Sequence, residues 1–515
     1  MRAMAWMTTG VVTGLLCVAG CGPANARKAA PDAPLAQTRS GTLAGERSGD
    51  ITVFRGIPYA AAPVGQRRWT APAPMPAWQG TRQAIAFAPS CPQPAVPPPF
   101  GVQGAQSEDC LYLNVWTPKD AAAGSLPVFV WIHGGAFLIG AGSQPIYDGA
   151  TLARQGMVVV TPNYRLGALG FLNHRALAGQ AGGSANFGLL DQIAALQWVR
   201  DNIAAFGGDP GNVTLAGESA GGVSVQALMA GPLARGLFHK AVIQSGGGLS
   251  GMVDARSEIA LQAGDAWAAS VGGKPGISAA ELRALPAEGL AQSRFIAFPA
   301  IDGHVLERNP ALTFAQGGQA QVPLLIGANS WEASLAVLDD SYARFVLAGE
   351  YEPLLASYRA GGLPEPAARE QLRTDLFFVQ PARYLASLHA RSQPTWLYHF
   401  DMVPASLRGK QSGAAHGGEL AYLFATPASV FTTWDARDHA ASREVTQRWA
   451  RFAASGDPNR PGAPEWKSAR NGQFLLLQSK LRMASPSPQD QHATEVIVRA
   501  SQPWIGATAS GSAGP

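Results

Sequence analysis

The sequence predicts an α/β protein, with a mostly parallel central sheet that is covered by helices on both faces. Short apolar runs typical of buried parallel strands recur at 128–132, 157–160, 213–216, 241–243 and 324–326. Segments with helical spacing lie between them, and in 189–203 the residues Leu190, Ile193 and Leu196 follow that spacing. Strands that alternate with helices favour a parallel sheet, because each connecting helix packs on a face of the sheet.

The composition is that of a folded chain. Of the 515 residues, 47% are hydrophobic, and the formal net charge is +4 with Lys and Arg scattered along the chain. A core of this size can be buried, and the charge pattern excludes a nucleic-acid-binding surface. No linker divides 46–505, which we predict to be one domain, with irregular insertions at 249–294 and 338–373. The small and polar residues 506–515 predict a disordered tail.

The N-terminus predicts an export signal. Arg2 precedes an apolar stretch at 10–20 that is too short to span a bilayer. The letters VAGC at 18–21 match a bacterial lipobox, whose cleavage after residue 20 leaves a lipidated Cys21, whereas ANA at 24–26 is an ordinary cleavage site. We favour the lipobox, followed by a flexible tether over 21–45. The expected location is periplasmic or on the outer membrane as a lipoprotein, and alternatively secreted; the lipid is the only expected membrane contact.

The cysteine count agrees with export. Cys17 leaves with the signal and Cys21 is acylated or removed, so Cys91 and Cys110 remain. In an oxidising compartment a bridge between them would contribute about 3 kcal/mol. The alternative is two separate buried thiols. Metal binding is not expected, because neither cysteine has a second Cys or His at ligand spacing.

The strongest local motif is GESAG at 217–221, which fits the pattern G-x-S-x-G. It follows the strand-like 212–216 and precedes a predicted helix at 222–229. Glycines two residues either side of Ser219 allow neighbouring backbone to approach closely, so that the hydroxyl projects from a sharp turn. This arrangement predicts the nucleophile elbow of an α/β-hydrolase fold.

A serine nucleophile requires a base and a group that orients the base. His416, in GAAHGGE at 413–419, is the best placed of nine histidines, because its small neighbours suit a tight loop. The acid should lie between the serine and the histidine in the chain, and Glu332 follows the apolar strand 323–327. Taken alone, an exposed histidine and a surface carboxylate are the alternatives.

Donors for an oxyanion are expected from WIHGGAF at 131–137, which follows a predicted strand. We assign the oxyanion hole to the backbone N–H groups of Gly135, Ala136 and Ala220. His133 is expected to be structural. The alternative is that the glycine pair merely forms a turn.

Together these residues resemble the type-B carboxylesterase and cholinesterase family over about 40–470. The matching segments are FGGDP (206–210), VTLAGESAGG (213–222), SEDCLYLNV (107–115), FRGIPYA (54–60), NYRLG (163–167), GLLDQ (188–192), QSG (244–246) and GDPN (456–459). The resemblance implies a catalytic triad of Ser219, His416 and Glu332. It further implies a disulfide between Cys91 and Cys110, and supporting roles for Glu218 and Ser245 near the nucleophile and the histidine.

Two departures from the family pattern narrow the expected substrate. Ala333 follows Glu332 where the family usually has Gly, and the loop between the two cysteines holds no Trp, with Phe100 as its sole aromatic residue. Cholinesterases place a choline-binding Trp in that loop. The chain therefore resembles bacterial carboxylesterases of the p-nitrobenzyl esterase group.

The resemblance implies hydrolysis of small-molecule carboxylic esters through an acyl-enzyme, with no metal or organic cofactor. The substrates expected are general, xenobiotic or natural-product esters. Two alternatives stay open. One is a non-catalytic adhesion or binding module of the same fold, and the other is cleavage of amides, carbamates or lactones by the same site.

Overall fold

The computed structural model describes residues 32–177, 185–249, 252, 254–255, 257–293, 295, 298–335 and 339–506. The predicted signal segment and the lipidation site Cys21 lie outside these residues. None of the helices in the described ranges is long and apolar enough to cross a bilayer.

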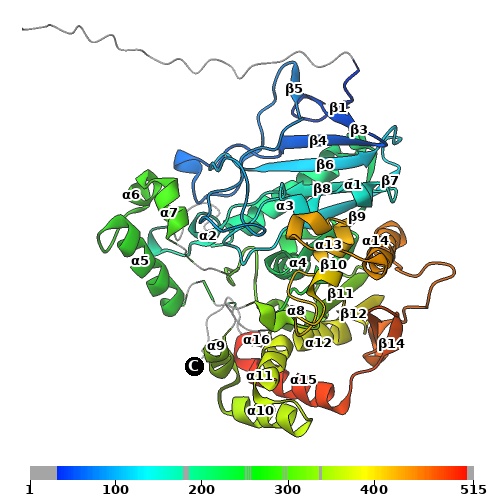
Figure 1. Cartoon of the computed structure of the whole chain (residues 1–515). Helices are drawn as coiled ribbons and strands as arrows, with labels where there is room; N and C mark the ends of the chain where they lie inside the picture. The colour runs from blue at the N-terminus through cyan, green and yellow to red at the C-terminus, as the bar shows by residue number, and fades with distance from the viewer. Residues whose placement is uncertain are drawn as a thin grey trace, which may run out of the picture.

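One large sheet organises the described chain (Figure 1). Its strands follow the order β14-β13-β12-β11-β10-β9-β7-β8-β6-β4-β3. The run from β8 to β13 is parallel, and the pairs at both edges are antiparallel. The strands are β3 (Glu46–Ser48), β4 (Ile51–Pro58), β6 (Tyr112–Pro118), β7 (Leu126–Ile132), β8 (Val158–Pro162), β9 (Gly208–Glu218), β10 (Lys240–Gln244), β11 (Leu324–Asn329), β12 (Thr395–Phe400), β13 (Phe474–Leu477) and β14 (Arg482–Ala484).

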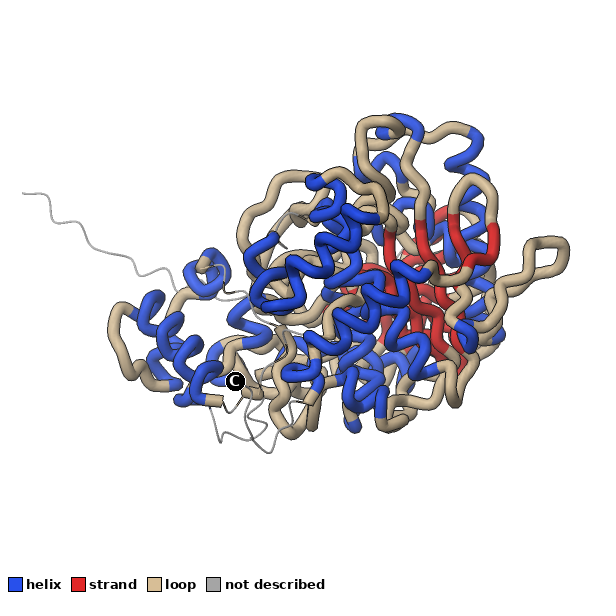
Figure 2. Tube along the Cα trace, turned by 90° about the horizontal axis from the view of Figure 1, so that it is seen from below, coloured by secondary structure: helices blue, strands red, loops and turns tan. Residues whose placement is uncertain are grey.

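Helices enclose this sheet, as Figure 2 shows. The α-helices are α1 (Ala150–Ala153), α2 (Gly167–Phe171), α3 (Phe187–Asn202), α4 (Ala220–Ala230), α5 (Glu258–Gly272), α6 (Ala279–Ala284), α7 (Ala287–Gln292), α8 (Pro310–Ala315), α9 (Asp340–Leu347), α10 (Tyr351–Ala360), α11 (Glu365–Thr374), α12 (Gln380–His389), α13 (Leu420–Phe424), α14 (Ala436–Ser455), α15 (Pro488–Ala500) and α16 (Gln502–Ile505). A π-helical turn, η8 (Asp375–Val379), joins α11 to α12.

Alternating side chains of the central strands fill two separate cores. In β7, Val128 and Val130 belong to the core that α3, α4, α8 and α12 cover, while Phe129 and Trp131 belong to the core that α13 and α14 cover. Both faces of the strand are therefore buried, which explains why the central strands consist of continuous apolar runs.

Two sequence predictions differ from the structure. The segment 21–45 was predicted to be a flexible tether, but β1 (Leu35–Gln37) and β2 (Thr42–Ala44) pair with each other and β2 pairs with β5 (Thr81–Gln83). Leu43 is buried in the core, and that burial fixes the strands of 35–44; residues 21–31 of the predicted tether lie outside the described residues.

The insertions at 249–294 and 338–373 were predicted to be irregular, but they contain α5 to α7 and α9 to α11. Side-chain caps stabilise several of these helices, since Ser257 caps α5, and Ser278 forms a capping box with Glu281 at α6. Figure 1 shows α5, α6 and α7 grouped on one side of the molecule, away from the sheet.

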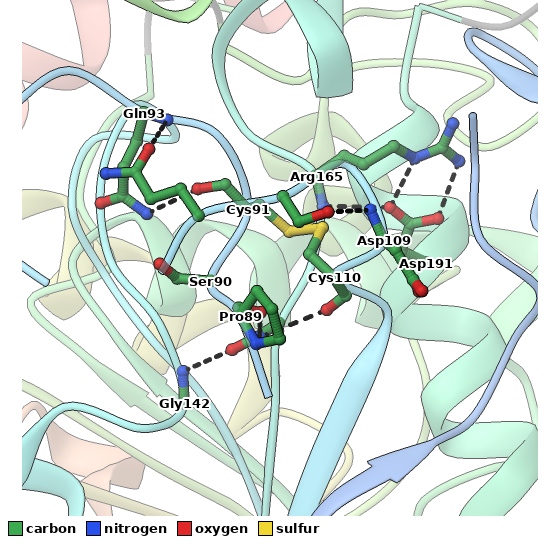
Figure 3. The surroundings of a disulfide bond; sticks show 12 residues. Pro89, Ser90, Cys91, Gln93, Asp109, Cys110, Gly142, Arg165 and Asp191 are labelled. Atoms are coloured by element: carbon green, nitrogen blue, oxygen red, sulfur yellow. Dashed lines mark hydrogen bonds and ion pairs between the residues drawn. A yellow bond between two sulfur atoms is a disulfide. The ribbon is translucent and has the colours of Figure 1, made fainter. Parts of the chain in front are cut away.

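A disulfide joins Cys91 and Cys110 (Figure 3). Both cysteines are buried, and the Arg165 guanidinium nearby donates two hydrogen bonds of 2.7 Å to the carboxylate of Asp191. These two charged residues come from the family-like segments NYRLG and GLLDQ, so their shared role is a buried ion pair that fixes α3 beneath the loop after β8.

Candidate active site

Ser219 lies in a strained turn between the end of β9 and the start of α4. Its backbone has φ 55° and ψ −123°, a region that non-glycine residues rarely adopt. The Ser219 N–H donates to the carbonyl of Gln244 at the end of β10, which helps to hold the turn. The hydroxyl is thereby presented at the carboxyl edge of the parallel strands, where ligands of such sheets bind.

The two glycines of the motif are required by close backbone contacts. A Cβ atom on Gly221 would lie 2.0 Å from the carbonyl oxygen of Ile132, and one on Gly217 would lie 2.5 Å from the backbone of Gly221. Any side chain at either position would therefore push β9, α4 and the end of β7 apart. The two glycines of the pattern G-x-S-x-G are therefore explained by this close backbone packing.

His416 lies between Ser219 and Glu332. Its Nε2 atom is 2.8 Å from Ser219 Oγ, and its Nδ1 atom is 2.5 Å from Glu332 Oε2. The His416 side chain is 11% exposed and that of Glu332 is fully buried. The carboxylate is therefore shielded from water, while part of the imidazole remains accessible. The structure thus brings together three residues that are far apart in the sequence.

Both carboxylate oxygens of Glu332 are held in place. Glu332 begins a short 3₁₀ turn after β11, and its Oε1 atom accepts hydrogen bonds from the Asn329 N–H at 2.7 Å and from Ser245 Oγ at 2.5 Å. The other oxygen, Oε2, is left for His416. Ser245 therefore contacts the acid directly, at the position where the family resemblance placed a supporting residue.

The loops that carry Glu332 and His416 are tied to each other. The His416 N–H donates to Ser334 Oγ at 2.8 Å, and the Trp331 N–H donates to the Ala414 carbonyl at 2.9 Å. Ala333, where the family usually has glycine, keeps a negative φ and donates its N–H to Thr374 Oγ1 at 3.1 Å. Alanine fits there without backbone strain.

The predicted oxyanion donors lie in two segments that adjoin the nucleophile, the loop after β7 and the start of α4. Gly135 and Ala136 have φ values of 105° and 55°, and a Cβ on Gly135 would lie 2.1 Å from the Ile139 carbonyl oxygen. Ala220 is the first residue of α4, so its N–H is one that the helix leaves free. A Cβ on Gly134 would approach the Ser219 Cβ to 3.2 Å, which shows that this loop packs directly on the nucleophile elbow.

Comparison with known proteins identifies the family of the chain. A family model described as "Carboxylesterase family" matches residues 32–347 and 366–494. The chain belongs to the carboxylesterase family. It is 38% identical to the para-nitrobenzyl esterase of Bacillus subtilis (strain 168), over 86% of this chain and 94% of that protein. It is 37% identical to the fumonisin B1 esterase of Sphingopyxis macrogoltabida, over 86% of each.

Solved carboxylesterase structures share the fold over most of this chain. A PNB esterase structure superposes with a TM-score of 0.80 at 35% identity, covering 89% of this chain and 99% of the other. A Geobacillus stearothermophilus carboxylesterase gives a TM-score of 0.78 at 35% identity with the same coverage. The predicted α/β-hydrolase fold and the family resemblance are confirmed, and the protein is a carboxylic ester hydrolase.

Three buried glutamates, Glu218, Glu332 and Glu419, act electrostatically on the His416 imidazole of this carboxylesterase. Burial would lower the pKa of His416, but the carboxylates of Glu218 and Glu332 outweigh this effect and raise it above its ordinary value. Glu218 Oε1 is 3.3 Å from His416 Nε2 and has no hydrogen-bond partner among the described residues, and burial raises the pKa of this carboxyl. Glu218 therefore faces the side of the imidazole that meets Ser219.

His133 has a structural role, as predicted from the sequence. Its ring is buried and stacks on Tyr164 at 4.3 Å, and the Tyr164 hydroxyl donates to the His133 carbonyl at 2.9 Å. Burial lowers the pKa of His133 to about 4, so the ring is neutral at physiological pH. In the described part of the chain, no group of three or more His, Cys, Asp or Glu residues is placed to hold a metal ion.

Sequence reasoning missed Glu419 and the amide network around it. The Gln244 and Asn329 side-chain amides donate to Glu419 at 3.0 and 2.5 Å, and the Trp449 indole donates to Gln244 at 2.8 Å. Burial raises the pKa of Glu419. Its place three residues after His416, in the same short motif, was the available signal. These hydrogen bonds connect the loop that carries His416 to the ends of β10 and β11.

Proposed function

We propose that this protein hydrolyses carboxylic esters through an acyl-enzyme formed on Ser219, with His416 as general base and Glu332 as the acid that orients it. The observation that carries the proposal is the contact in series of hydroxyl, imidazole and carboxylate, at 2.8 and 2.5 Å. A hydroxyl is a weak nucleophile unless a positioned base removes its proton, and this series supplies that base.

The proposed reaction has two halves. Ser219 Oγ attacks the ester carbonyl while His416 Nε2 takes its proton, and the N–H groups of Gly135, Ala136 and Ala220 stabilise the oxyanion. His416 then returns the proton to the alcohol oxygen, the alcohol leaves, and the acyl group stays on Ser219. His416 then takes a proton from a water molecule that attacks the acyl carbonyl, and returns it to Ser219 Oγ as the carboxylic acid is released.

The substrate class that we infer is that of a general carboxylesterase acting on xenobiotic or natural-product esters. Relatives named para-nitrobenzyl esterase and fumonisin B1 esterase support this class. The presence of all three reactive residue types argues against a non-catalytic binding module. Amide, carbamate or lactone cleavage would use the same residues, and a panel of such substrates ranked by kcat/KM against esters would separate these activities.

Covalent labelling tests the acyl-enzyme. We expect the diethyl phosphate ester paraoxon to inactivate the enzyme, and mass spectrometry to locate one phosphoryl group on the peptide that contains Ser219. We further expect p-nitrophenyl acetate to give a burst of p-nitrophenol equal to the enzyme concentration, when deacylation is the slower half. Inactivation with the phosphoryl group on another residue would refute the assignment.

We also propose that the enzyme is exported, as a periplasmic or outer-membrane lipoprotein anchored through Cys21. The lipobox letters and the paired Cys91 and Cys110 support export, because disulfides persist in oxidising compartments. Mass spectrometry of the mature N-terminus from a bacterial host should find diacylglycerol on Cys21. A free N-terminus at Arg27 would instead indicate ordinary cleavage and secretion.

A further inference from the structure

The π-helical turn η8 packs against the loop that follows β10. The Phe377 carbonyl accepts a hydrogen bond of 2.9 Å from the Gly248 N–H. Such π turns are frequent at functional sites. The Asp375 carboxylate accepts hydrogen bonds from the Tyr358 hydroxyl and, at 3.0 Å, from the Gln380 amide. The turn is therefore fixed at several points.

Glycine at position 247 makes room for the turn. A Cβ there would lie 2.2 Å from the Phe377 carbonyl oxygen and 2.7 Å from the Phe378 ring. Gly247 is two residues from Ser245, which donates to Glu332, and three from Gln244, whose carbonyl holds the Ser219 N–H. The Phe378 ring consequently lies against the segment that supports the catalytic residues.

The Phe378 ring also contacts the base. Its centroid is 4.8 Å from that of the His416 ring, with the two planes inclined by 42°. Phe378 is buried, with 7% of the residue exposed. Phe377 points elsewhere, because its ring stacks on Tyr342 at 5.5 Å and 13°. Of these two neighbouring phenylalanines, Phe378 borders the imidazole and Phe377 packs on α9.

The chemistry of the reaction places the alcohol portion of the ester beside the His416 imidazole. His416 must return a proton to the oxygen of the departing alcohol, so that oxygen lies beside the imidazole when the tetrahedral intermediate collapses. The oxyanion donors come from other elements, the loop after β7 and the start of α4. A ring that borders His416 therefore borders the alcohol portion of the ester.

We propose that Phe378 is a specificity-determining residue, which forms an aromatic wall for the alcohol portion and favours esters of flat aromatic alcohols. This inference rests on the proposed function. Aromatic rings attract each other in offset or edge-on geometry beyond the simple burial of area, and such pairs correspond to rate effects of about two- to tenfold. A saturated ring of the same carbon skeleton lacks this attraction.

The test compares benzyl acetate with cyclohexylmethyl acetate, which differ only in ring saturation. The wild-type ratio of kcat/KM values should favour benzyl acetate, and Phe378→Leu should lower that ratio about two- to tenfold. Phe377→Leu is the matched control, since it changes the same turn without touching His416, and its ratio should stay within about twofold of wild type. Active sites are titrated with paraoxon, so each value refers to folded enzyme.

A second pair of esters tests whether Phe378 lies beside the alcohol portion or the acyl portion of the substrate. Ethyl phenylacetate and ethyl cyclohexylacetate carry the ring on the acyl side, and their ratio should be unchanged by Phe378→Leu. A change confined to this acyl pair, or an equal change in both phenylalanine variants, would overturn the inference. If Phe378→Leu yields no titratable sites, Phe378→Met gives the same comparison. Failure of the proposed function would look different, because wild-type enzyme would cleave none of the four esters.

Discussion

Replacing Ser219 with alanine is expected to lower kcat for p-nitrophenyl acetate by about 10⁴- to 10⁶-fold, because no other hydroxyl is offered to His416 Nε2 among the contacts of the described site. The oxyanion donors and the binding surface remain in this variant, so a small rate above the uncatalysed reaction should persist. The burst of p-nitrophenol should disappear, since no acyl-enzyme can form.

Steady-state and stopped-flow assays of the purified variant measure both effects. Ser224→Ala is the matched control, because Ser224 lies in α4 just after the nucleophile, is buried, and donates its hydroxyl to the Ala220 carbonyl at 2.9 Å. This control should retain the burst and keep kcat within about tenfold of wild type. Turnover at an ordinary rate by Ser219→Ala would mean that another group is the nucleophile.

Much of the central sheet could be predicted from the sequence, because buried parallel strands consist of continuous apolar residues. The predicted segments 128–132, 213–216, 241–243 and 324–326 all lie within the observed strands β7, β9, β10 and β11. β12 and β13 were not predicted. β12 contains Thr395 and His399 among its apolar residues, which interrupts the apolar pattern. β13 is a continuous apolar run of only four residues, and a run that short does not by itself distinguish a strand from a segment of buried helix.

In the candidate site, too, some residues could be found from a local sequence pattern and others depend on contacts between distant segments. Ser219 could be found because its strained turn requires glycines within two residues of it. His416 and Glu332 are 84 residues apart, and their contact depends on the order of the strands that precede their loops. Local sequence patterns do not give this order, so these two residues were assigned with the help of the family resemblance. Phe378 left no signal, because its contact with His416 depends on a π turn with no sequence pattern of its own.

Replacing Glu332 with glutamine is expected to lower kcat by about 10⁴-fold, although two further buried glutamates lie close by. Glu332 alone among the three contacts Nδ1, the nitrogen that must carry the proton when Nε2 acts as base. A neutral amide cannot stabilise the imidazolium, and its NH₂ group can favour the wrong tautomer. The loss should persist across the pH range, since raising the pH does not restore the missing charge.

The matched controls are Glu419→Gln and Glu218→Gln, which remove a carboxylate of the same length from other sides of the site. Glu419 is bonded to the side chains of Gln244 and Asn329, so its loss should cost far less than that of Glu332. Glu218 raises the pKa of His416. A protonated imidazole cannot accept the Ser219 proton, so kcat/KM falls as the pH drops through that pKa. Glu218→Gln lowers the pKa and should move this acid limb to lower pH.

Profiles of kcat/KM against pH for the three variants therefore separate the three roles. Glu332→Gln should show a large loss at every pH, Glu218→Gln a displaced acid limb with kcat within about tenfold of wild type, and Glu419→Gln a profile near that of wild type. If Glu419→Gln were the most damaging of the three, the acid would have to reach His416 through a rearranged loop. The hydrogen bonds from Asn329 and Ser245, which now hold Glu332 in place, would then have to break.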